Sequence, residues 1–137
     1  MPEITGLGEI VVDMVLKVPH LPEPDEKVDS RQQARFPGGV TANYVTAVSR
    51  LATTAGFVGA IGDDSEGEYL KRDLKNEKVD TTLTLVKKGR QTPVNYVIVD
   101  EKGQKVIIQS PHMLTTRLDK EDIRPDYISK SKLLHTT

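Results

Sequence analysis

The chain contains no cysteine, which excludes a disulfide framework and any metal site built on thiolates. Tryptophan is also absent and only two phenylalanines occur in 137 residues, so a core has to be built mainly from Val, Ile and Leu. No apolar run approaches the ~20 residues that a membrane-spanning helix needs, and the first residues lack the basic and apolar segments of a signal peptide. These absences favour a soluble, cytoplasmic protein without a membrane partner.

The charges are nearly balanced, with 19 Lys and Arg against 20 Asp and Glu and a formal net charge of −1. The basic residues form no stripe, so the sequence lacks the electrostatic footprint of a nucleic-acid-binding protein. Its three histidines are scattered without the spacing of metal ligands. We therefore expect one globular domain that holds no metal and binds no nucleic acid.

The order of the predicted elements indicates an α/β fold. The mostly apolar segment 4–18 predicts a buried strand, a turn and a second extended piece, and residues 57–61 predict another buried strand. Helices are predicted after Gly39 and from Gly67 to about Asn76. Strands that alternate with helices in this way predict a parallel sheet covered by helices.

The first of these helices has an apolar spacing of i, i+3, i+4 and i+7, which predicts one inward face. The residues expected on that face are Tyr44, Ala47, Val48 and Leu51.

Short strands follow the second helix and predict a small antiparallel lid that projects from the α/β core. We place the lid strands near residues 10–35 and 83–109, with hairpin turns at 87–90 and 101–104. A last apolar run at 132–135 predicts one more strand. A parallel sheet that stopped there would leave apolar edges open, so we expect the chain to be a fragment.

Three sequence features could carry chemistry, and each also has a purely structural interpretation. Asp13 lies in an apolar run, where its carboxylate either caps a local turn or accepts hydrogen bonds from two hydroxyls of a polyol. Gly38 and Gly39 precede a predicted helix and form either a tight turn or a close backbone approach to a ligand, which Asn43 could also reach. Asn95 and Gln109 are polar positions in two apolar lid strands, so they face either solvent or a ligand.

The run from Gly62 to Gly67 contains two adjacent carboxylates, Asp63 and Asp64. The run lacks the further spaced ligands of a calcium loop, so a helix cap with turn glycines is the better interpretation.

Taken in order, these pieces resemble the ribokinase, or PfkB, family of carbohydrate kinases over nearly the whole chain. The residues that carry the resemblance are Gly8–Asp13 (GEIVVD), Pro22–Val28 (PEPDEKV), Gly38–Asn43 (GGVTAN), Phe57–Gly67 (FVGAIGDDSEG) and Thr92–Val106. The resemblance implies that residues 1–137 form the N-terminal, substrate-binding part of a ribokinase-like three-layer α/β sandwich with a β-sheet lid.

The resemblance also implies roles for six residues. Asp13 would bind sugar hydroxyls, Gly38 and Gly39 would let the backbone approach the sugar, and Asn43 would hydrogen-bond to it. Asn95 and Gln109 would lie over the substrate on the lid strands. The sequence departs from the family pattern at Thr41 and Val45, where the family usually has small residues.

The implied reaction is the ATP-dependent phosphorylation of a sugar or nucleoside hydroxyl. The family's motif for the catalytic base is absent from the chain, so we expect no catalytic residue here and an inactive isolated chain. ATP and Mg²⁺ would bind mainly to a missing C-terminal part, and lid strands could pair in a homodimer. Ribose, fructose, a sugar acid, a nucleoside and a sugar phosphate all remain open, with a neutral substrate favoured because no basic residue is placed for an anionic group.

Two alternatives remain open beside the kinase fragment. The chain could be a complete, non-catalytic module that binds a sugar or a partner. It could also be a small α/β domain whose resemblance is only structural.

Overall fold

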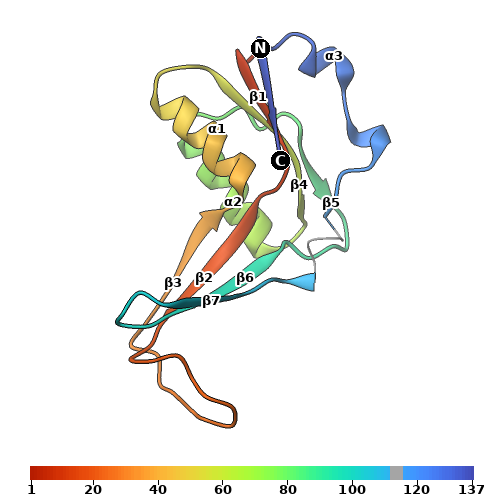
Figure 1. Ribbon diagram of the computed structural model, residues 1–137. Coiled ribbons are helices and arrows are strands. Elements are labelled where there is room, and N and C mark those ends of the chain that lie inside the picture. The colour runs from red at the N-terminus through yellow and green to blue at the C-terminus, as the bar shows by residue number, and fades with distance from the viewer. Residues whose placement is uncertain (112–115) are drawn as a thin grey trace.

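The computed structural model describes residues 1–111 and 116–137 and contains two four-stranded sheets (Figure 1). The main sheet is parallel and has the strand order β5-β4-β1-β8. Its strands are β1 (Ile4–Leu7), β4 (Ala55–Gly62), β5 (Thr84–Lys87) and β8 (Leu133–Thr136). The second sheet has the order β3-β2-β6-β7 and projects away from the main sheet. Its strands are β2 (Val11–Lys17), β3 (Gln32–Gly38), β6 (Val94–Val99) and β7 (Lys105–Ile108).

Helices lie on both faces of the main sheet. The two longer helices, α1 (Val40–Arg50) and α2 (Ser65–Asn76), cover one face. The segment that carries the 3-10 turn η2 (Lys120–Asp122) and the short helix α3 (Pro125–Ile128) lies on the opposite side (Figure 1). Within residues 1–111 and 116–137, every helix is too short or too polar to cross a lipid bilayer. The α/β fold with a small second sheet is therefore confirmed.

Helix α1 packs unusually closely on β1 because β1 presents glycine there. A Cβ atom placed on Gly6 would lie 2.5 Å from Cγ1 of Val45. This contact turns Thr41, Val45 and Val48 inward, and all three are buried. The predicted inward face is therefore confirmed at Val48 and in part at Tyr44, which packs against the core, but it is wrong at Ala47 and Leu51. Leu51 is 81% exposed, since it lies just beyond the last turn of the helix rather than on its packed side.

The second sheet is anchored in the same core as the main sheet. Val12 of β2 has no exposed surface, and it belongs to one apolar cluster with Phe57 of β4 and Leu70 of α2. Val94 of β6 packs against this cluster. The base of the second sheet is thus fixed, while its far end projects into solvent (Figure 1).

The predicted lid needs two corrections. The strand near residue 84 belongs to the main sheet, because β5 pairs in parallel with β4, with Thr84 buried opposite Gly59. The turn at 87–90, closed by a hydrogen bond from Arg90 N to Lys87 O of 3.3 Å, therefore leads from one sheet to the other and does not join a hairpin. In addition, β2 and β6 run parallel, so the second sheet is mixed rather than antiparallel.

Asp64 ties the end of β4 to the start of α2 and to the chain that enters β6. It is the N-cap of α2, and its Oδ1 atom accepts a hydrogen bond from Gly67 N at 2.9 Å. Its Oδ2 atom accepts from Thr92 N at 2.8 Å, and the buried Thr92 hydroxyl accepts from Gly62 N at 2.9 Å. Burial alone would raise the pKa of Asp64, but the hydrogen bonds from Thr92 and Gly67 together lower it. The predicted cap is therefore confirmed, and Asp64 has a structural role.

We expect Asp64→Ala to lower the free energy of unfolding by about 2–3 kcal/mol at pH 7, through the loss of a helix cap and of hydrogen bonds to a charged acceptor. Because the pKa is lowered in the folded state, the contribution of this carboxylate is complete above its ordinary pKa and is lost as the pH falls below that range. Urea unfolding at pH 7 and pH 3 should therefore show a smaller difference between wild type and variant at pH 3.

The neighbouring Asp63 offers a matched control. It is exposed, and it accepts one hydrogen bond, from Gly89 N at 2.9 Å. Asp63→Ala should cost less than about 1 kcal/mol. Equal losses for the two variants, or a pH-independent loss for Asp64→Ala, would contradict the assigned role.

Candidate functional site

Three strands bring polar groups together where the second sheet meets the N-terminus of α1. Asp13 of β2 lies opposite Phe36 of β3 and beside Asn95 of β6 in the sheet register. Residues paired in this way project from the same face of a sheet. Asn95 Nδ2 donates a hydrogen bond to Asp13 Oδ1 at 3.2 Å, and Asn95 Oδ1 accepts one from Ser110 N at 3.4 Å. The two side chains therefore hold each other in a defined orientation.

The two glycines after β3 let the backbone pass very close to this pair. A Cβ atom on Gly38 would lie 2.3 Å from Asp13 Oδ2. Gly39 is the N-cap of α1 with a φ of 101°, and a Cβ atom there would lie 2.6 Å from the carbonyl oxygen of Glu9. The Gly38-Gly39 pair is thus required by both space and backbone conformation.

This arrangement leaves hydrogen-bonding capacity for a ligand. Among the described residues, none donates a hydrogen bond to Asp13 Oδ2, and no side chain caps the N-terminus of α1. A carboxylate oxygen accepts from hydroxyl groups, while the first N–H groups of a helix can donate to a ligand. The cluster formed by Asp13, Asn95, Gly38 and Gly39 can therefore bind a molecule that presents hydroxyl groups.

The other two predicted site residues adjoin this cluster, since Asn43 N donates to Gly39 O at 2.9 Å and Gln109 precedes Ser110, whose N–H donates to Asn95. Asn43 is exposed on α1 and lines a groove of about 720 Å³ between α1, α2 and β3. Gln109, also exposed, lines a different hollow of about 380 Å³ together with Asp64 and Thr92. The structure therefore brings four of the six predicted residues into direct contact, while the side chains of Asn43 and Gln109 form no hydrogen bond to Asp13 or Asn95 among the described residues.

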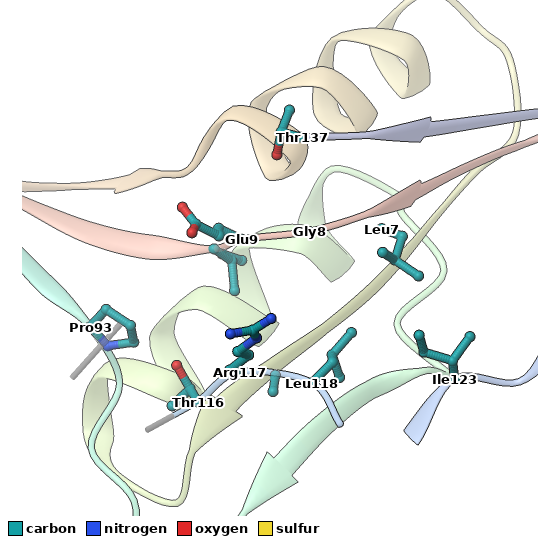
Figure 2. Close-up of a pocket in the computed structure, with 11 residues that line it drawn as sticks. Leu7, Gly8, Glu9, Pro93, Thr116, Arg117, Leu118, Ile123 and Thr137 are labelled. Atoms are coloured by element: carbon teal, nitrogen blue, oxygen red, sulfur yellow. The ribbon is translucent and has the colours of Figure 1, made fainter. Parts of the chain in front are cut away.

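Another cavity, of about 420 Å³, lies at the carboxyl ends of β1, β4 and β8 (Figure 2). Its polar lining residues include Glu9, Thr116 and Arg117, none of which the sequence predicts as a site residue. Glu9 follows a predicted strand, and ligands of parallel sheets bind at this strand end, so a signal for Glu9 existed. The sequence carried no such signal for Arg117, because this residue follows no predicted strand and belongs to no motif.

The described residues contain no cluster of metal-binding side chains. Within residues 1–111 and 116–137, no group of three Asp, Glu, His or Cys side chains is placed to hold a metal ion. His112, one of the three histidines, lies outside the described residues. No metal-dependent step is therefore assigned to side chains of this part of the chain.

Comparisons with known proteins agree on one family. The profile described as pfkB family carbohydrate kinase matches residues 1–137. The chain is 33% identical over 108 residues to the ATP-dependent ribose-1-phosphate kinase of Halopiger xanaduensis, which covers 79% of the chain and 36% of that protein. The chain spans about a third of the length of the curated relatives that it matches.

Two solved structures show the same fold. A sugar kinase from Pyrococcus horikoshii in complex with ATP superimposes with a TM-score of 0.79 at 26% identity, covering 97% of this chain and 42% of that one. The ribokinase of Cryptococcus neoformans in complex with ADP gives a TM-score of 0.72 at 26% identity, covering 80% of this chain and 35% of that one. The α/β core and the second sheet thus match this kinase fold.

Proposed function

Because the chain belongs to the pfkB family of carbohydrate kinases, we propose that it forms the acceptor-binding part of an ATP-dependent kinase that phosphorylates a hydroxyl group of a sugar or nucleoside. The observation that carries this proposal is the Asp13 carboxylate, which Asn95 orients beside Gly38 and which keeps one oxygen without a protein donor among the described residues. The names of the relatives, which include ribose-1-phosphate kinase, fructokinase and ribokinase, support a sugar or a sugar derivative as the acceptor.

In this proposal Asp13 accepts hydrogen bonds from two neighbouring hydroxyl groups of the acceptor. The backbone at Gly38 and Gly39 lies against the same part of the sugar, because no side chain keeps it away. Asn95 fixes the carboxylate and also presents its amide to the acceptor. Such contacts orient the acceptor so that one remaining hydroxyl faces the phosphoryl donor, and orientation of this kind accounts for much of the rate in a reaction between two substrates.

ATP supplies the transferred phosphoryl group, and Mg²⁺ offsets the charge on its phosphates. We propose that both bind mainly to parts of the enzyme beyond these 137 residues, as does the catalytic base. ATP and ADP in the two related structures support the nucleotide. An ATP-dependent enzyme of this kind would work in the cytoplasm.

The proposal is tested by an ATP-consumption assay on the protein at its native length, across neutral sugars, sugar phosphates and nucleosides. We expect phosphorylation of a hydroxyl in one of these classes. Binding of sugars without any consumption of ATP would instead support a non-catalytic binding module. If neither binding nor consumption of ATP occurs, the proposal fails.

We also propose that the second sheet mediates a homodimer. Its face that carries Asp13 also presents Phe36, which is 52% exposed, and Ile107, which is 51% exposed. Exposed apolar groups of this size on a sheet with two open edge strands favour association. Analytical ultracentrifugation should give twice the monomer mass at micromolar concentration, and a monomer at all concentrations would exclude this arrangement.

A further inference from the structure

The cavity at the carboxyl ends of β1, β4 and β8 has a polar part and an apolar part. Figure 2 shows Leu7, Leu118 and Ile123 together on one side and Glu9, Thr116 and Pro93 on the other, with Arg117 between the two groups. Its volume of about 420 Å³ is in the range of small-molecule sites. Its position at the ends of parallel strands is where α/β proteins bind their ligands.

Arg117 brings a positive charge to this cavity that no described carboxylate neutralises. Among residues 1–111 and 116–137, no ion pair involves its guanidinium group. The two acidic residues that follow it, Asp119 and Asp122, are already bound by Lys87. Glu9 also lines the cavity, but Figure 2 shows its carboxylate directed to a different side of the strand from Arg117.

The cavity adjoins the Asp13 cluster through the backbone. Glu9 and Ile10 line the cavity and lead directly into β2, which carries Asp13. Pro93, another lining residue, accepts a hydrogen bond from Val12 N at 2.9 Å and precedes β6, which carries Asn95. The cavity and the Asp13 cluster are therefore connected through residues 9–13 and 93–95.

We propose that Arg117 is a specificity-determining residue that binds an anionic group, a phosphate or a carboxylate, on the acceptor substrate. The planar guanidinium group donates two parallel hydrogen bonds to either kind of anion. The anionic group pairs with Arg117 in the middle of the cavity, and the apolar side chains contact carbon atoms of the sugar. This inference rests on the proposed kinase function and replaces the expectation of a neutral acceptor, which assumed that no basic residue was suitably placed.

The test compares matched neutral and anionic acceptors with the protein at its native length. The probes are ribose with ribose 1-phosphate and ribose 5-phosphate, fructose with fructose 6-phosphate, and glucose with gluconate. Steady-state kinetics give kcat/KM for each, and ligand-induced shifts of the melting temperature report binding independently of activity. The sugar phosphates and the sugar acid separate the two possible anionic groups.

We expect wild type to prefer an anionic member of at least one pair, and Arg117→Gln to lower kcat/KM and binding for that member by about 10- to 100-fold. The neutral member of the pair should change by less than about twofold, and Arg117→Lys should retain part of the preference, because it keeps the charge. Arg72→Gln is the matched control, since Arg72 is exposed on α2 on the opposite face of the main sheet.

A wild-type preference for the neutral members would overturn the inference and leave the kinase proposal intact. An anionic preference that survives in Arg117→Gln would also overturn it, because the selectivity would then lie elsewhere. If no acceptor of any kind is phosphorylated or bound, the proposed function itself fails, and the inference fails with it.

Discussion

Replacing Asp13 by Asn should lower kcat/KM for the acceptor by about 30- to 150-fold. A hydrogen bond to a charged acceptor contributes about 1.5–3 kcal/mol and one to a neutral acceptor about 0.5–1.5 kcal/mol, so weakening two of them removes about 2–3 kcal/mol of transition-state stabilisation. The amide has the same shape and can still accept a hydrogen bond from Asn95, so the melting temperature should change little. KM for ATP should stay unchanged, because the substitution acts on the acceptor.

Asp29→Asn is a suitable control for this experiment. Asp29 lies in the exposed loop between β2 and β3, and it forms no hydrogen bond or ion pair within the described part of the chain. Its substitution should leave all kinetic constants within about twofold. A loss of less than about fivefold in Asp13→Asn, with the fold intact, would exclude the carboxylate as the main contact to the acceptor.

Gly39→Ala should destabilise the protein by about 3 kcal/mol or more. A φ of 101° is strained for any residue with a Cβ atom, at a cost of about 1–3 kcal/mol. The new methyl group would also lie 2.6 Å from the carbonyl oxygen of Glu9, which has to move, and Glu9 leads into β2. Urea denaturation of the variant measures the total loss.

Gly89→Ala separates the two contributions. Gly89 also has a positive φ, of 67°, but a Cβ atom there meets nothing within 4 Å. The Gly89→Ala substitution should lower the free energy of unfolding by about 1 kcal/mol, because only the backbone conformation is strained. If both variants lose the same stability, the close approach of Gly39 to Glu9 does not contribute, and the tight passage from β3 to α1 is not a structural requirement.

Features set by neighbouring residues were predictable from the sequence. A carboxylate cap of α2 from Asp63 or Asp64 was expected, because a carboxylate shortly before a helix is a local signal, and the structure selects Asp64. The shared site of Asp13, Gly38 and Gly39 was implied only by the family resemblance, because these positions are far apart in the sequence; the structure places Asp13 directly against Gly38. The turn at residues 87–90 was also expected. The sequence predicted that it joins a hairpin, whereas it connects the two sheets.

Features set by tertiary contacts were not predictable. The inward side of α1 depends on the glycine surface of β1, which draws Val45 inward and leaves Leu51 outside. The membership of β5 in the main sheet depends on pairing with β4, and strand propensity does not say which sheet a strand joins. Arg117 lines its cavity together with residues far from it in sequence, so no local pattern marks it.

The central claim, that the Asp13 cluster binds the acceptor, is tested most directly by a ¹H–¹⁵N NMR titration with the acceptor that the assay identifies. The account predicts the largest shifts at the backbone amides of Gly38 and Gly39 and at the side-chain amide of Asn95, with smaller shifts at the side-chain amides of Asn43 and Gln109. Shifts confined to the groove that contains Asn43, or to the hollow that contains Gln109, would contradict it.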